Sequence, residues 1–155
     1  MARIICRTPS TGRPIRIQYA NIPTVFTSVA EAPDFSVPDA AEAFPVRDPL
    51  DSTRTIKSGE IFFLTPLAVV NKSESTQWVE TQLLAEDGSI ISFGRVLIPA
   101  GDTAYIPIQG RSLFKRDAIA VSGDRLQLKA ESSAVLDVWG AAEEKLSSEH
   151  IGVIS

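Results

Sequence analysis

Hydrophobic and polar positions alternate along much of the chain. The clearest case is Arg125–Ala130, where Leu126, Leu128 and Ala130 are separated by charged or polar residues. A period of two residues is typical of a β-strand with one buried face. Apolar runs bounded by turn residues are also typical of strands. These criteria predict further strands over residues 13–19, 22–29, 60–70 (with a break at Pro66), 77–85, 90–98, 103–107 and 134–140.

Residues typical of tight turns separate these predicted strands. Asp87-Gly88 lies between two apolar runs and indicates a hairpin whose two central residues take positive φ. Polar or glycine-containing turns are also expected at 71–75, 99–102 and 122–124. No long helical periodicity is visible, although residues 141–146 are compatible with a short helix. The pattern predicts an all-β protein, an antiparallel β-sandwich of Ig-like or jelly-roll-like type.

Residues 20–55 differ from the rest because they contain five prolines. Proline lacks a backbone N–H, so a long regular element is not expected there. Apolar side chains, among them Phe26, Phe35 and Phe44, recur in this stretch and need a surface to cover. We therefore divide the chain into N-terminal strands with an extended proline-rich arm (1–55), a sandwich core (56–142) and a C-terminal tail (143–155). Two interpretations of the arm stay open: it packs on its own domain, or it lies on a neighbouring subunit.

Length, composition and charge exclude several classes of function. A chain of 155 residues with 44% hydrophobic and 22% charged residues fits one globular domain. The net charge is −4 and basic residues are scattered singly, so we expect no direct nucleic-acid binding. The longest nearly apolar stretch, 61–70, is far shorter than the roughly 20 residues of a membrane helix, and no signal peptide is expected. With Cys6 as its one cysteine, the chain has no intramolecular disulfide, and we expect it to fold in the cytoplasm.

The sequence offers no recognisable catalytic group. Its one histidine, His150, lies near the C-terminus, far from Cys6, so neither a zinc site nor a Cys-His pair is expected. Glu86-Asp87 and Glu143-Glu144 are adjacent pairs that point apart, whereas glycosidases need two carboxylates facing each other. No phosphate loop or dinucleotide motif is present. We therefore predict no enzyme activity, no cofactor and no metal.

Calcium is the one metal that the sequence leaves as an alternative. Asp102, Asp117 and Asp124 lie near turns, where carboxylates and backbone carbonyls can bind this ion. Aspartate beside glycine, however, is mostly explained by turn formation.

Two tryptophans are assigned to the outer faces of strands. If Leu136 and Val138 point inward, Trp139 points outward; if Val79 points inward, Trp78 points outward. Tryptophan is enriched in protein interfaces. The alternative is that the arm or tail of the same chain covers the two rings. The candidate interface residues are Phe26, Phe35, Phe44, Trp78 and Trp139.

A set of turn motifs between residues 69 and 142 is shared with a known class of protein. They are Val-Val-Asn-Lys-Ser at 69–73, Glu-Asp-Gly-Ser at 86–89, Leu-Ile-Pro-Ala-Gly-Asp-Thr at 97–103, Gly-Asp-Arg-Leu-Gln-Leu-Lys-Ala at 123–130 and Val-Leu-Asp-Val-Trp-Gly at 135–140. This part of the chain resembles small β-sandwich virion proteins of tailed bacteriophages. It departs from them in the proline-rich insert after Ala32 and in its C-terminal extension.

The resemblance implies a structural role without an active site. Such proteins occur as head decorations, neck or connector rings and tail subunits, so the expected location is the virion, assembled in the host cytoplasm. The expected partners are copies of the chain itself, as a homo-oligomer, and other virion proteins. The first alternative is a carbohydrate-binding or receptor-binding module, in which Trp78, Tyr105 and Trp139 would line one concave surface. The second is a hydrolase, which would need a close carboxylate pair in a deep pocket.

Overall fold

A computed structural model of the chain describes residues 13–34, 47–48, 51–55, 59–116 and 122–145. Every regular element in these segments is a β-strand, which confirms the predicted all-β class. No helix capable of crossing a membrane occurs in the described segments. The strands are β1 (Arg13–Tyr19), β2 (Thr27–Glu31), β3 (Arg47–Asp48), β4 (Asp51–Thr55), β5 (Gly59–Phe63), β6 (Leu67–Asn71), β7 (Gln77–Leu84), β8 (Ile90–Ile98), β9 (Thr103–Ile106), β10 (Ser112–Lys115), β11 (Arg125–Ala130) and β12 (Leu136–Lys145).

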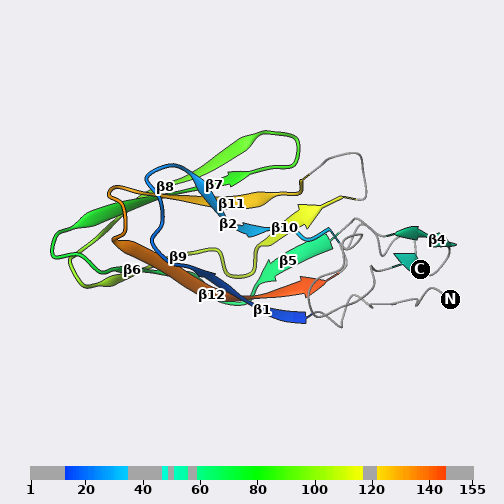
Figure 1. Ribbon diagram of the computed structural model, residues 1–155, viewed down its shortest axis with the longest axis horizontal. Coiled ribbons are helices and arrows are strands. Elements are labelled where there is room, and N and C mark those ends of the chain that lie inside the picture. The colour runs from blue at the N-terminus through cyan, green and yellow to red at the C-terminus, as the bar shows by residue number, and fades with distance from the viewer. Residues whose placement is uncertain (1–12, 35–46, 49–50, 56–58, 117–121, 146–155) are drawn as a thin grey trace.

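The strands form two antiparallel sheets that lie against each other in a curled, sandwich-like arrangement (Figure 1). Sheet A is built around β12. On one side β12 pairs with β1, and on the other it pairs first with β6 and then with β5. β9 pairs with β6 and β10 pairs with β5. Sheet B has the order β2-β11-β7-β8, and β3 and β4 form a separate small hairpin. The predicted antiparallel sandwich is confirmed at this level of detail.

The core lies between the two sheets and contains the side chains that the alternation predicted. Leu126, Leu128 and Leu136 are 0% exposed and Val138 is 1% exposed. Alternation in β11 arises because only one face of the strand meets the opposite sheet. The other large core side chains are Ile17, Ile22, Ile61, Phe63, Leu67, Val69, Val79, Ile98, Ile106, Ile108 and Leu113.

The predicted strand 60–70 is two strands, with the break centred on Leu64–Pro66 and not on Pro66 alone. The break remains attached to β12 through one residue of that strand. The backbone N–H groups of Leu64 and Thr65 donate to the carbonyl oxygen of Ala141 at 2.9 and 3.3 Å. Ala141 N donates in return to Thr65 Oγ1 at 3.0 Å. The side-chain hydroxyl of Thr65 thus accepts a bond that a regular strand would accept with its backbone.

The last strand is longer than predicted. We expected it to end at Gly140, with a helix-compatible segment after it and a tail from residue 143, but β12 continues to Lys145. Residues 142–145 pair with β5, and Glu144 also lies opposite Arg13 of β1. The Arg13 guanidinium contacts the Glu144 carboxylate at 2.8 Å. Pairing on both sides decides the conformation here against the local helix preference of alanine, glutamate and lysine.

The N-terminal strands also belong to the sandwich, which corrects the expectation that residues 1–55 precede it. β1 lies in sheet A and β2 lies in sheet B. The predicted strand 22–29 is displaced to Thr27–Glu31 because Ile22 is fully buried and donates its N–H to the carbonyl oxygen of Leu136 at 2.8 Å. Residues 35–46, with two of the prolines, Phe35 and Phe44, lie outside the described residues, so a proline-rich arm there stays a prediction.

The predicted β7–β8 hairpin is present, but its turn differs from the predicted one. Gly88 has a φ of 90°, whereas Asp87 is not in the positive-φ region. Gly88 N donates to Ala85 O at 2.9 Å, and Ala85 N donates to Ser89 O at 2.8 Å. This is a three-residue loop that ends in a left-handed glycine. Asp87 Oδ1 accepts hydrogen bonds from Ser89 N and Ser89 Oγ, at 2.9 and 2.6 Å. Outside this hairpin, β10 and the small β3–β4 hairpin were not predicted from the sequence.

Candidate functional site

Among the described residues, most of the exposed large apolar or aromatic side chains lie in two separate places, and Val25 and Leu64 are exposed elsewhere. Ile90, Ile91 and Leu97 lie on β8 at one edge of sheet B, and we call them and the free edge of that strand the β8 surface. Tyr105 and Trp139 lie on the outer side of sheet A. We call the residues around them the Trp139 face: Arg16, Gln18, Ala68, Tyr105, Asp137 and Trp139.

The strand register places the Trp139 face in one row across four strands. Gln18 of β1 lies opposite Trp139 of β12, and Trp139 lies opposite Ala68 of β6. Ala68 in turn lies opposite Tyr105 of β9. Directly opposed residues of antiparallel strands point to the same face of the sheet. Trp139 and Tyr105 therefore project from the same side, with one strand between them.

Ala68 lies between the two aromatic residues in the row. Its methyl group points to the outer face, yet the residue is only 1% exposed because its neighbours in the row are large. Trp139 is 54% exposed and Tyr105 is 63% exposed. Neighbouring side chains therefore cover Ala68, and the exposed aromatic residues lie on either side of it in the row.

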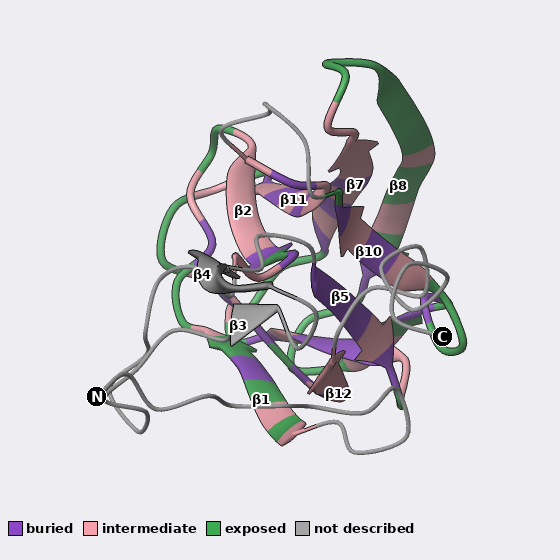
Figure 2. Ribbon diagram, turned by 90° about the vertical axis from the view of Figure 1, so that its right-hand side faces the viewer, coloured by how far each residue is buried: buried purple, intermediate pink, exposed green. Residues whose placement is uncertain are grey.

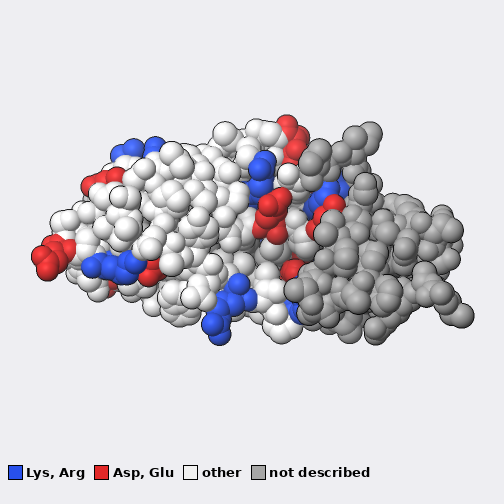
Figure 3. All heavy atoms as spheres, in the orientation of Figure 1, with Lys and Arg blue, Asp and Glu red and all other residues white. Residues whose placement is uncertain are grey.

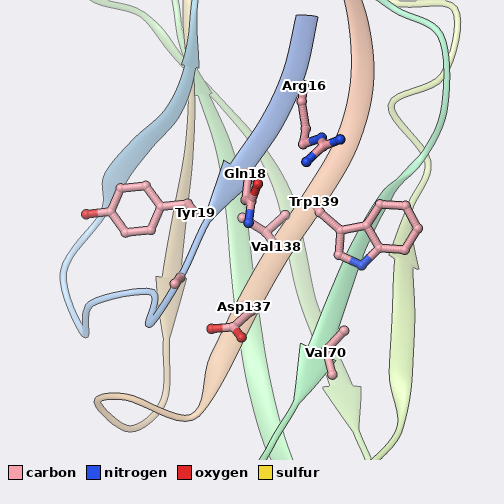
Figure 4. Close-up of a pocket in the computed structure, with 8 residues that line it drawn as sticks. Arg16, Gln18, Tyr19, Val70, Asp137, Val138 and Trp139 are labelled. Atoms are coloured by element: carbon pink, nitrogen blue, oxygen red, sulfur yellow. The ribbon is translucent and has the colours of Figure 1, made fainter.

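Polar side chains lie around Trp139 on the side away from Tyr105. Figure 4 shows Arg16 and Gln18 projecting from β1 and Asp137 and Trp139 from β12, around one depression, while Tyr19 points away from the other side chains. This depression has a volume of about 430 Å³. A second depression, lined by Pro14, Ile15, Thr65 and Gly140 among others, lies on the other side of Trp139. The indole is therefore accessible from both sides.

Asp137 is the one residue of the Trp139 face whose charge is fixed by specific partners. Its Oδ1 accepts the backbone N–H of Asn21 at 2.8 Å and lies 3.0 Å from Lys72 Nζ. Burial raises the pKa of Asp137, but the Asn21 N–H and the Lys72 ammonium outweigh it, so the pKa lies below its usual value. Asn21 has a φ of 57°, a left-handed conformation that asparagine tolerates better than most residues. Asp137 therefore stays ionised and also fixes the loop after β1.

Four other groups on this face have no hydrogen-bond or ion-pair partner within the described part of the chain. They are the guanidinium of Arg16, the amide of Gln18, the hydroxyl of Tyr105 and the indole N–H of Trp139. All four project from the same side of sheet A. The face therefore combines two exposed aromatic side chains with several hydrogen-bonding groups that are available to a ligand.

Trp78 is in a different place and a different environment. It lies on the outer face of sheet B, so Trp78, Tyr105 and Trp139 do not line one common surface, as the carbohydrate-binding alternative required. Trp78 is only partly exposed, and the Arg95 guanidinium lies 4.0 Å from its ring centroid. Lys129 Nζ lies 5.9 Å from the same ring and 5.5 Å from the ring of Phe26. These cation–π contacts cover part of Trp78 without a partner chain.

The predicted interface residues are thus not brought together. Trp139 lies on sheet A, whereas Trp78 and Phe26 share a row of aromatic and cationic side chains on sheet B. Phe35 and Phe44 lie outside the described residues. An interface role for these residues stays a prediction.

The β8 surface is the long free edge of sheet B. β8 has nine residues, and among the described strands it pairs on one side only, with β7. Ile90, Ile91 and Leu97 are 59%, 55% and 70% exposed. Figure 2 shows the hairpin end of β8 as exposed and extending beyond the rest of sheet B. A long edge strand with exposed aliphatic side chains can pair with another chain.

One irregularity interrupts this edge. The β7–β8 register shifts between Thr81 and Gln82, and Gly94 opposite Thr81 has a φ of 82°. Bulges of this kind bend an edge strand and limit where it can pair. The bulge leaves two short regular segments on either side of Phe93 and Gly94, each of which carries exposed aliphatic side chains.

The β8 surface was not predicted from the sequence. A signal was present, because Ile90 and Ile91 are adjacent and side chains of successive strand residues point to opposite faces. One of the two must therefore face away from the core. Arg16 and Gln18 lie in the predicted strand 13–19, but nothing in their spacing linked them to Trp139.

The described residues give no support for metal chemistry. No group of three or more His, Cys, Asp or Glu side chains in them could hold a metal ion. Asp102 Oδ1 accepts Thr103 N at 2.8 Å, and Asp124 accepts Glu86 N and Phe114 N at 2.9 and 3.1 Å, so both aspartates hold turns together. His150, Cys6 and Asp117 lie outside the described residues.

Charged side chains are dispersed over the described surface. On the side of the molecule seen in Figure 3 they lie singly or in small mixed groups around a broad uncharged area. An extended basic stripe of the kind that binds nucleic acids is not visible on that side.

Comparisons with known proteins identify no relative. No protein-family model matches the chain, and no curated protein matches it.

Proposed function

We propose that this protein is a non-enzymatic structural subunit that binds neighbouring protein subunits in the virion of a tailed bacteriophage. The observation that carries the proposal of protein binding is the β8 surface, where three large exposed aliphatic side chains lie on an edge strand. The place in a phage particle rests on the sequence motifs of residues 69–142. The same motifs support the finer assignment of the fold as an Ig-like or jelly-roll-like sandwich with a proline-rich arm.

The partner proposed for the β8 surface is a strand of a second copy of the chain. The unpaired edge of β8 presents backbone N–H and C=O groups that an added strand satisfies, which is the basis of β-strand addition. Full burial of an aliphatic side chain contributes about 1.5–3 kcal/mol. Ile90, Ile91 and Leu97 are each more than half exposed, so each would contribute about 1–2 kcal/mol on association. A contact of this size suits an assembly in which each subunit has several neighbours.

Size-exclusion chromatography with light scattering tests this proposal. The full chain is run over a range of concentrations beside Ile91→Lys and Leu97→Lys, which place a charge on the edge strand. We expect the unchanged chain to form oligomers and both variants to shift toward the monomer. Val25→Lys is the matched control, because Val25 is 66% exposed and precedes β2 at the opposite edge of sheet B.

Two results would overturn the proposal. One is a chain that stays monomeric at all concentrations and does not bind isolated phage particles. The other is an oligomer that Ile91→Lys and Leu97→Lys leave intact, since β8 would then not be the contact. Circular dichroism of each variant checks that the fold is retained.

A further inference from the structure

The second surface has a chemistry different from that of β8, and it goes beyond the structural role. We infer that the Trp139 face is a binding site for an extended, unbranched β-1,4-linked oligosaccharide. Sugar rings in such a chain present apolar C–H faces, which pack on aromatic rings, and a rim of hydroxyl groups, which need hydrogen-bond partners. The Trp139 face supplies both features.

The spacing of the two aromatic side chains fits this ligand. Trp139 and Tyr105 lie in one row with Ala68 between them, two strand positions apart. Neighbouring strands are about 4.8 Å apart, so the backbones that carry the two rings are separated by about 9.6 Å. In an extended β-1,4-linked chain each sugar is rotated by about half a turn relative to the one before it. Every second sugar therefore presents the same face, and two such sugars are separated by about two ring lengths. Two alternate sugars can therefore pack on Trp139 and Tyr105 while the sugar between them connects the two positions.

The polar groups around Trp139 fit the hydroxyl rim. Gln18 lies directly beside Trp139 in the row, and Arg16 lies two residues before it on the same face of β1. Neither side chain has a hydrogen-bond partner within the described segments. Asp137 is ionised, and its contacts with Asn21 and Lys72 leave lone pairs for a sugar hydroxyl. The donors of Arg16 and Gln18 and the acceptor of Asp137 thus lie on the side of Trp139 away from Tyr105.

The contrast with the β8 surface favours a glycan over a protein at this site. The exposed large side chains of β8 are aliphatic, and adjacent Ile90 and Ile91 have no exposed aromatic neighbour. The Trp139 face has two exposed aromatic residues, and the outward positions around them are polar or small except for the partly buried Val70, which lies opposite Asp137. Aromatic rings interleaved with free donors and acceptors are what a polar ligand with apolar ring faces requires.

Tryptophan fluorescence gives a direct test, because the chain has two tryptophans on different sheets. In the full chain with Trp78→Phe, all tryptophan emission comes from Trp139; in Trp139→Phe it comes from Trp78. The probes are cellohexaose and chitohexaose, with maltohexaose as the control, since its α-1,4 linkage curves the chain away from a flat row. We expect cellohexaose or chitohexaose to change the emission of Trp139 saturably, and to bind at least about tenfold more tightly than maltohexaose. The emission of Trp78 should not change.

Affinity measured by calorimetry on variants completes the test. Trp139→Ala and Tyr105→Ala should each weaken binding at least about tenfold, and Gln18→Ala should weaken it less. Leu97→Lys is the matched control and should leave glycan affinity unchanged, even where it alters the oligomer. The inference is overturned if neither cellohexaose nor chitohexaose changes the emission of Trp139, if maltohexaose binds equally well, or if binding survives Trp139→Ala. Loss of self-association in Trp139→Ala without any glycan binding would instead make this face a protein interface.

Discussion

Replacement of Asn71 tests how the two sheets are held together at one end of the sandwich. Asn71 ends β6 and is 0% exposed. Its Nδ2 donates to Ser75 O at 2.8 Å, to Ile98 O at 2.9 Å and to Pro99 O at 3.2 Å. Its Oδ1 accepts Ser73 N at 2.9 Å and Ser73 Oγ at 2.7 Å. One side chain therefore connects the β6–β7 turn with the β8–β9 turn.

The expected loss of stability in Asn71→Ala arises because three carbonyl oxygens lose the hydrogen-bond donor that Asn71 supplies. The carbonyl oxygen of Ile98 is buried, so the loss of its donor costs about 1–3 kcal/mol. The bonds to Ser75 O and Pro99 O are partly buried and contribute about 0.5–1.5 kcal/mol each. Water can replace the bonds to Ser73, which is partly exposed. The free energy of unfolding should therefore fall by about 2–6 kcal/mol.

Urea unfolding followed by circular dichroism measures this change. Ser73→Ala is the control, since it removes one partner near the surface and should cost less than about 1 kcal/mol. A loss below about 1 kcal/mol in Asn71→Ala would refute the assignment of Asn71 as the connection between the two turns.

Asn71→Asp gives the same test a pH dependence. A carboxylate at this position would face three carbonyl oxygens, and burial among them would raise the pKa of the new group above its unfolded value of about 3.9. The variant should therefore be least stable at neutral pH and should gain stability as the pH falls through the raised pKa. The same stability at pH 7 and at low pH would contradict this reasoning.

Three further changes have expected outcomes. Leu128→Ala removes a fully buried side chain and should lower the free energy of unfolding by about 2–5 kcal/mol, with urea titration as the measurement and a loss below about 1 kcal/mol as the contrary result. The pKa of Asp137 is lowered in the folded protein, so its contribution is present above about pH 4 and is lost as the pH falls further. In Asp137→Asn the free energy of unfolding should depend less on pH below about pH 4. The same pH dependence in the variant and the unchanged protein would contradict this expectation. Gly123→Ala would place a Cβ 2.6 Å from Lys115 Cβ and 2.9 Å from Ala32 Cβ, and a thermal melt should show a loss of about 1–3 kcal/mol rather than no change.

Strands bounded by turn residues at both ends were predictable from the sequence. β11 and β8 have the predicted bounds, because turn residues mark both ends of each strand. In β11 the alternation also gave the correct facing. In β8 it could not, because apolar residues occupy both faces: Val96 and Ile98 pack inward while Leu97 is 70% exposed.

Features that depend on distant pairing were not predictable. Residues 141–145 favour a helix by composition, and only β5 and β1 on either side make them a strand. The buried role of Asn71 depends on Ile98, 27 residues away in the chain. The Trp139 face is similar: the outward orientation of Trp139 was predicted, but its row with Gln18, Ala68 and Tyr105 follows from strand order.

The central position of β12 has a consequence for how the chain folds during synthesis. β12 follows all of its partners in sequence, and its contact between Arg13 and Glu144 spans 131 residues. Sheet A therefore cannot close while translation is still short of residue 145, and until then β1, β5 and β6 lack their common neighbour. Closing so long a loop is slow, and unpaired strands are prone to aggregate in the meantime. We expect nascent chains that stop before β12 to depend on chaperones and to be degraded rapidly.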